Sequence, residues 1–202
     1  MSVKLNSFIL PDNIIKKMEE QIEKTRNIKI EHGLNLCKHN GNIIYKDECT
    51  GDTCEIRIKS ECSNQDITPK VGDFHTHPRG SPKMSLADLK NACHHDFKCI
   101  GSIDNSIICF AKKSVPYPEG CSIEVENIII GTEEISRETG MLKRERSMLD
   151  TLKNIPNVDM NKYRELYNEH NIKIKQHNEN VSYLNKRKDM VRNTYFKEIR
   201  VK

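Results

Sequence analysis

Residues 71–89 read VGDFHTHPRGSPKMSLADL. The first half has the character of a buried strand, and it carries His75 and His77 two residues apart. Because side chains alternate along a strand, both imidazoles are expected on the same face of a sheet. The prolines and the glycine between 78 and 82 predict a loop after the strand. The segment therefore predicts a strand, a loop and then a helix that starts at Ser85.

The chemistry of this segment depends on Asp88, which lies three residues after Ser85. Two neutral imidazoles and one carboxylate form the ligand set of a catalytic zinc, whose fourth position is left for water. We therefore expect His75, His77 and Asp88 to bind one zinc ion (Zn²⁺). Ser85 and Asp88 also have the spacing of a helix capping box. The two interpretations are compatible, since an acid at a helix start can still point toward the histidine strand.

The joint spacing, His-x-His followed after seven residues by Ser-x-x-Asp, resembles the signature of the JAMM (MPN-plus) zinc metalloproteases. The resemblance covers roughly residues 5–130. It implies an α/β fold in which helices sandwich a mixed β-sheet. It also implies that His75, His77 and Asp88 bind the metal, and that Ser85 positions the zinc-bound water or stabilises the oxyanion.

The same resemblance requires a general base, which is a glutamate on an earlier strand. Glu31 is the first choice, because residues 28–37, IKIEHGLNLC, alternate as a strand should. Glu31 falls on the face opposite the apolar residues of this run. The alternatives are Glu48, in a turn-like stretch, and Glu55 and Glu61, which flank a strand where salt bridges would suit them.

These residues together predict a zinc-dependent isopeptidase. Glu31 would take a proton from the zinc-activated water and return it to the departing amine, and Ser85 would stabilise the oxyanion. The resemblance implies, as the bond that is cleaved, the link between the C-terminal glycine of a ubiquitin-like modifier and a lysine amine. One alternative is a zinc peptidase that trims a sulfur-carrier protein or another small peptide. Another is a non-catalytic MPN scaffold that acts through its helical tail.

The whole chain predicts two domains, a JAMM-like catalytic domain over 1–131 and a basic helical extension over 132–202. Strands interspersed with two helices favour a mixed α/β sandwich for the first domain. Its first helix is expected to begin at Pro11 and Asp12 and to place four apolar residues on one face: Ile14, Ile15, Met18 and Ile22. Further strands are expected at 7–10, 42–45, 54–58, 99–103, 107–111, 121–125 and 128–130.

The C-terminal third has a different composition. Residues 132–202 contain 16 Lys or Arg and 11 Asp or Glu. Between 160 and 195, seam residues recur at alternating steps of three and four, as in a coiled coil, although His170, His177 and Lys188 occupy three of the positions. An earlier helix over about 133–153 would fold back on this one as a hairpin.

Several partners are conceivable for the predicted hairpin. Docking on its own catalytic domain or on a second copy is the first expectation, because an amphipathic stripe is most often a packing surface. Recruitment of a protein substrate, such as a conjugate of a ubiquitin-like modifier, or of another protein is the alternative. Nucleic acid is not expected, since the basic end lacks aromatic residues interleaved with its charges.

Composition also predicts the cellular setting. The chain has no apolar run long enough to cross a membrane, and its start lacks the pattern of a signal peptide. We therefore expect a cytoplasmic protein without membrane contact. Its eight cysteines are expected to be reduced rather than paired. Their spacings include no Cys-x2-Cys pair, so a second zinc is not expected.

Overall fold

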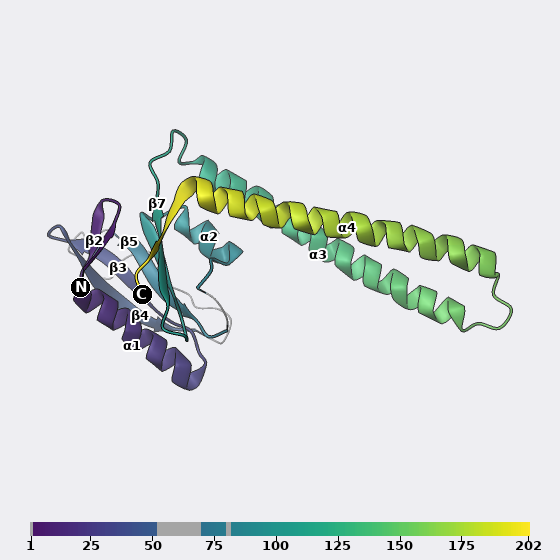
Figure 1. The fold of residues 1–202 in the computed structure, drawn as a ribbon, viewed down its shortest axis with the longest axis horizontal. Helices are drawn as coiled ribbons and strands as arrows, with labels where there is room; N and C mark the ends of the chain where they lie inside the picture. Colours follow the sequence, from purple (N-terminus) through teal and green to yellow (C-terminus); the bar gives the residue numbers. More distant parts are fainter. Residues whose placement is uncertain (1, 52–69, 80–81) are drawn as a thin grey trace. The chain divides into compact units, whose positions relative to one another are not determined.

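The computed structural model describes residues 2–51, 70–79 and 82–202. The chain divides into two compact units, and Figure 1 labels most of their helices and strands. The first unit comprises Met1–Ser122 and Arg192–Lys202, and the second comprises Ile123–Val191. The boundary expected at residue 131 falls inside a helix of the second unit, and the end of the chain belongs to the first.

Among the described residues, a six-stranded mixed sheet forms the centre of the first unit. Its strand order is β4-β3-β5-β6-β7-β8, in which only β5 and β6 are parallel neighbours. A separate sheet pairs β1 (Val3–Leu5) with β2 (Phe8–Leu10). The α/β class and the mixed sheet are therefore as predicted. The six strands are β3 (His32–His39), β4 (Asn42–Thr50), β5 (Lys70–His77), β6 (Phe97–Ser102), β7 (Ile107–Lys112) and β8 (Phe196–Arg200).

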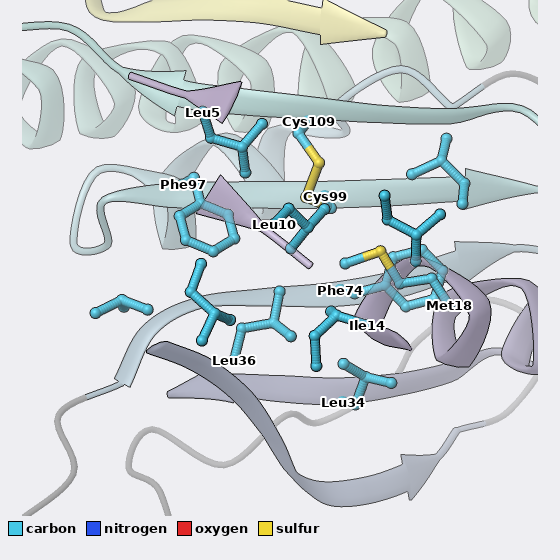
Figure 2. Close-up of a cluster of buried hydrophobic side chains, with 14 of the residues drawn as sticks. Leu5, Leu10, Ile14, Met18, Leu34, Leu36, Phe74, Phe97, Cys99 and Cys109 are labelled. Atoms are coloured by element: carbon cyan, nitrogen blue, oxygen red, sulfur yellow. A yellow bond between two sulfur atoms is a disulfide. The ribbon is translucent and has the colours of Figure 1, made fainter. Parts of the chain in front are cut away.

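Helix α1 (Asp12–Ile28) covers one face of the six-stranded sheet. All four residues predicted for its apolar face are buried, at the spacing of an amphipathic helix. Ile14 packs in a cluster with Phe74 of β5 and with apolar residues of the other strands, as Figure 2 shows. Gly101 of β6 permits the close approach of α1, because a Cβ there would lie 2.8 Å from both Ile22 and Phe74.

The opposite face of the sheet carries the candidate site. Phe74 and Thr76 of β5 face α1. Phe74 belongs to the core cluster, and Thr76 forms a hydrogen bond with Thr25 of the helix. By strand alternation, His75 and His77 face the other side. Helix α2 (Leu86–Ala92) lies on that side, within reach of both histidines, and links the parallel strands β5 and β6. Helices α1 and α2 thus cover opposite faces of the sheet.

The prediction of two further strands is wrong. Residues 121–125 and 128–130 form the first turns of helix α3 (Gly120–Lys153) instead of closing the sheet. The prediction relied on a run of Ile and Val, whose strand preference depends strongly on context. Val125 and Ile128 are buried at a spacing of three, as in a helix, and β8 takes the edge of the sheet.

The strand expected over 28–37 begins later than predicted. Helix α1 continues through Ile28, which is exposed, and Lys29 ends the helix in the left-handed conformation with a φ of 59°. Strand β3 then starts at His32. Glu31 therefore immediately precedes the strand that was expected to contain it.

The second unit contains most of two antiparallel helices, α3 and α4 (Met160–Tyr195), which form the predicted hairpin (Figure 1). Glu138 contacts His177 at 2.7 Å, and Glu145 contacts His170 at 3.1 Å. Both contacts are seven residues apart on each helix, so they define a single register. Although α3 and α4 are long, no helix in the described ranges is apolar enough to cross a membrane.

The cysteines contradict the expectation that they are reduced. Cys99 and Cys109, which lie opposite each other in β6 and β7, form a disulfide that Figure 2 shows within the core cluster. Cys93, after α2, is bonded to Cys121, and Cys37 is also in a disulfide. These pairs arise from strand pairing and tertiary packing, which short spacing rules do not detect.

Candidate metal centre

Three potential ligands converge on the face of the sheet opposite α1. The Nε2 atoms of His75 and His77 lie 3.0 Å apart. Asp88 Oδ1 lies 3.0 Å from His75 Nε2, and Asp88 Oδ2 lies 3.4 Å from His77 Nε2. His75 and Asp88 are buried and His77 is half-buried, so the group has its open side at His77.

This donor set fits a zinc ion. Ligand atoms about 3.3 Å apart are expected around a tetrahedral zinc with bonds of about 2.0–2.1 Å, close to the spacing found here. Burial would raise the pKa of Asp88, but His75, His77 and Lys98 hold it well below its usual value. Burial lowers the pKa of His75, which favours the neutral ring that metal binding requires. The ionised carboxylate and the neutral imidazole are the forms that ligate zinc.

Ser85 caps α2 and at the same time orients Asp88. Its Oγ accepts a hydrogen bond from the Asp88 N–H at 3.1 Å, and Asp88 Oδ2 accepts one from the Ser85 N–H at 2.8 Å. The predicted capping box is confirmed, and the capping carboxylate still reaches both histidines. Ser85 itself is exposed, so its hydroxyl can donate a hydrogen bond outward.

Thr76, between the two histidines, ties the ligand strand to its neighbours. Its Oγ1 lies 2.5 Å from Oγ1 of Thr25 in α1. The same oxygen accepts a hydrogen bond from the His32 N–H at 2.9 Å and donates one to the His32 carbonyl at 3.2 Å. These contacts hold the start of β3 against β5, and Glu31 is the residue just before that start.

Strand alternation would assign Glu31 to the ligand face of the sheet, although Glu31 itself lies just before β3. Gly33 of β3 is directly opposite His75 of β5. The register ends at Gly33, so Glu31 lies two residues outside it, at a position with the same parity as Gly33. Glu31 is 7% exposed, so its position is enclosed rather than solvated.

The other candidate glutamates are placed differently. Glu48 belongs to β4 rather than to a turn, and the turn-like signal reflects a β-bulge near Asp47, whose φ is 50°. Glu48 contacts Lys17 of α1 at 2.7 Å, and this hydrogen bond lowers the pKa of Glu48 to about 2. A carboxylate so engaged is a poor general base. Glu55 and Glu61 lie outside the described residues.

A buried charged pair lies beside the ligands. Asp73 and Lys98 are register partners in β5 and β6, with Lys98 Nζ 2.6 Å from Asp73 Oδ1 and 3.6 Å from Asp88 Oδ1. Burial would lower the pKa of Lys98, but Asp73 and Asp88 raise it above its usual value. Burial would likewise raise the pKa of Asp73, yet Lys98 lowers it. Lys98 therefore lies between two buried carboxylates next to His75, and Lys70 Nζ also lies 3.5 Å from Asp73 Oδ2.

Sequence reasoning missed this pair, although part of its signal was present. Asp73 is a charged residue inside an otherwise buried strand, two residues before His75, so alternation puts it on the ligand face. Lys98 is likewise a charge inside a fully buried strand. Its partner could not be inferred, because that depends on which strand lies beside β5.

Within the ranges that the structure describes, His75, His77 and Asp88 are the one group of three or more His, Cys, Asp or Glu residues placed to hold a metal ion. No protein-family model matches the sequence, and a search of curated proteins also gave no match. The chemistry assigned to this centre therefore depends on the geometry and the burial of its own residues.

Proposed function

We propose that the protein is a zinc-dependent isopeptidase of the JAMM type. The observation that carries the proposal is the convergence of His75 Nε2, His77 Nε2 and the Asp88 carboxylate at 3.0 to 3.4 Å. Two further placements support it. Ser85 lies at the start of the helix that carries Asp88, and Glu31 lies two residues before Gly33, which is directly opposite His75.

The residues divide the chemistry among them. Zinc held by His75, His77 and Asp88 would lower the pKa of a water molecule and polarise the scissile carbonyl. Glu31 accepts a proton from the attacking water and passes it to the departing amine. The exposed Ser85 hydroxyl donates a hydrogen bond to the developing oxyanion, while its lone pair keeps α2 capped. No cysteine nucleophile is needed.

The proposed substrate is the isopeptide bond between the C-terminal glycine of a ubiquitin-like modifier and a lysine amine. The connection from α2 to β6 supports a compact enzyme, since α2 ends at Ala92 and β6 begins at Phe97. So short a connection leaves no space for a long insertion that reads the linkage between two modifiers. We therefore expect the modifier's own tail to supply most of the recognition.

The test uses the full chain, loaded with zinc and assayed for metal content before each reaction. The substrate is a ubiquitin-like protein joined through its terminal glycine to the lysine of a fluorescent peptide. We expect release of the peptide that stops with a chelator and returns with added zinc. His77→Ala should lose both zinc and cleavage. Glu31→Gln should keep one zinc and lose at least ~100-fold in kcat, the size of a general-base contribution.

Glu48→Gln is the matched control, because it makes the same chemical change in a glutamate paired with lysines of α1. Its kcat should stay within about twofold of the wild type, as expected for a surface ion pair. Zinc-loaded protein that cleaves no such conjugate would contradict the proposal and favour a different peptide substrate or a scaffold. Full turnover by Glu31→Gln would remove Glu31 from the mechanism.

A further inference from the structure

Helix α3 carries a stripe of exposed apolar side chains. Ile123, Ile130, Met141 and Met148 are 57%, 54%, 55% and 65% exposed. They are separated by 7, 11 and 7 residues. At about 100° per residue, the four lie within about 20° of a single line along the helix. Large apolar side chains gathered in this way are typical of a contact surface.

The order of this stripe is symmetric along the helix. Ile123 and Met148 are equally distant from the midpoint between residues 135 and 136, and so are Ile130 and Met141. A two-fold axis through that midpoint would bring each residue against its counterpart on a second copy. Self-complementarity of this kind is what an isologous interface requires, and a different partner protein would not require it.

The charges of α3 follow the same symmetry. Glu134 and Arg137 are exposed, lie near the line of the stripe and are equally distant from its midpoint. Residues 124–138 contain five Glu and one Arg, whereas residues 143–153 contain four Lys or Arg and two acids. Two antiparallel α3 helices would therefore place each acidic half against a basic half, and each Glu134 against an Arg137.

The composition of the second unit also favours a second copy over nucleic acid. Residues 123–191 contain twelve Lys or Arg and twelve Asp or Glu. With no net charge, the unit has no overall attraction for phosphates and no overall repulsion from a copy of itself. Beside the stripe is a hollow lined by Glu134, Arg137 and Met141 of α3 and by Tyr183 of α4. It offers a recess for side chains of the second copy.

We propose that α3 is a homodimer interface, in which two copies pack their α3 helices antiparallel about a two-fold axis at the midpoint of residues 135 and 136. Each apolar contact and each Glu134–Arg137 pair then occurs twice. The interface lies wholly within the second unit. It is independent of the proposed hydrolytic activity, and either proposal can fail without the other.

Sedimentation velocity of the full chain from about 1 to about 100 µM tests the proposal, because modest interfaces dissociate in this range. We expect the wild type to dimerise. Ile130→Glu and Met141→Glu should each raise the dimer Kd by at least ~100-fold, since each change is felt at two symmetric contacts. Met160→Glu on α4 is the matched control, because Met160 is 47% exposed and lies about 140° around the helix from Tyr183, and its Kd should be unchanged.

A charge exchange tests the position of the axis. Glu134→Arg and Arg137→Glu should each weaken the dimer by about tenfold, and the variant that carries both changes should recover, because the pair reforms with reversed signs. Circular dichroism verifies that every variant keeps its helices. A wild type that remains monomeric at about 100 µM overturns the proposal. So does equal weakening by Met160→Glu, or a failure of the double variant to recover.

Discussion

Histidines and carboxylates meet in both units of the molecule, but in different arrangements. In the sheet unit, His75 and His77 converge on the single carboxylate of Asp88. In the helical unit, His170 and His177 each contact a separate glutamate of α3, seven residues apart. Convergence of three donors can hold a cation, whereas separate pairs only join two helices. The arrangement of the side chains decides the chemistry, and their residue types do not.

The largest effect on stability is expected from removing the ammonium group of Lys98, which lies beside the three potential metal ligands. Lys98→Met leaves Asp73 and Asp88 buried without their common ammonium group, and should lower the free energy of unfolding by about 3–5 kcal/mol. Urea denaturation measures the change. The double variant Lys98→Met/Asp73→Asn should recover part of it. A loss below about 1 kcal/mol would show that water or another cation already neutralises these carboxylates.

The next largest effect is expected at Phe196, where the chain passes from the helical unit back to the sheet unit. Phe196 of β8 is 3% exposed and belongs to the sheet, although it directly follows α4. Phe196→Ala should therefore lower the free energy of unfolding by about 3 kcal/mol.

Replacing residues 123–191 by a short linker should leave the sheet unit folded and able to bind zinc. Loss of zinc binding in that shortened chain would show that the two units do not fold separately.

A smaller effect distinguishes the two kinds of histidine. Nε2 of His170 is buried and has no hydrogen-bond partner among the described residues, so His170→Leu should change the free energy of unfolding by less than about 1 kcal/mol. A chelator should still lower the Tm of that variant by about 5 °C or more, because zinc bound to the folded state stabilises it. The chelator should not change the Tm of His77→Leu. Equal chelator responses in both variants would contradict the assignment of the metal to the sheet unit.

The smallest effect is a dependence on pH at the surface of the sheet unit. The pKa of Glu48 is lowered from 4.5 to about 2 by its hydrogen bond to Lys17. A lowered carboxylate pKa stabilises the fold above pH 4.5, and this contribution is lost as the pH falls toward 2. Glu48→Gln should therefore cost less than about 1 kcal/mol at pH 7 and nothing near pH 2, since the pair is exposed to solvent. Urea denaturation of both proteins at several pH values measures the difference, and a constant difference would contradict the ion pair.

The parts of the site that the sequence predicts are those encoded locally. The spacing of His75 and His77 needs only strand alternation, and the capping box of Ser85 and Asp88 needs only helix geometry. Lys98 was missed because its contact with Asp73 depends on which strand lies beside β5. That neighbour is chosen by the packing of the whole sheet.

The fold was predictable to a similar extent. The apolar face of α1 and the hairpin of β6 and β7 follow from periodicity and turn residues. The run of Ile and Val from 121 to 130 was misread as strand, because preference for β-structure yields to helical packing. Strand β8 could not be foreseen, since its partner β7 lies some eighty residues earlier in the chain.

The return of the chain to the sheet at β8 has a consequence for how this protein can vary. The helical unit is an insertion, with both of its ends fixed in one sheet by β7 and β8. Matched additions or deletions of seven residues in α3 and α4 would preserve the register set by the two histidine–glutamate pairs. The strands would be unaffected. The helical unit could therefore change its length in steps of about 10 Å, which is seven residues at 1.5 Å each.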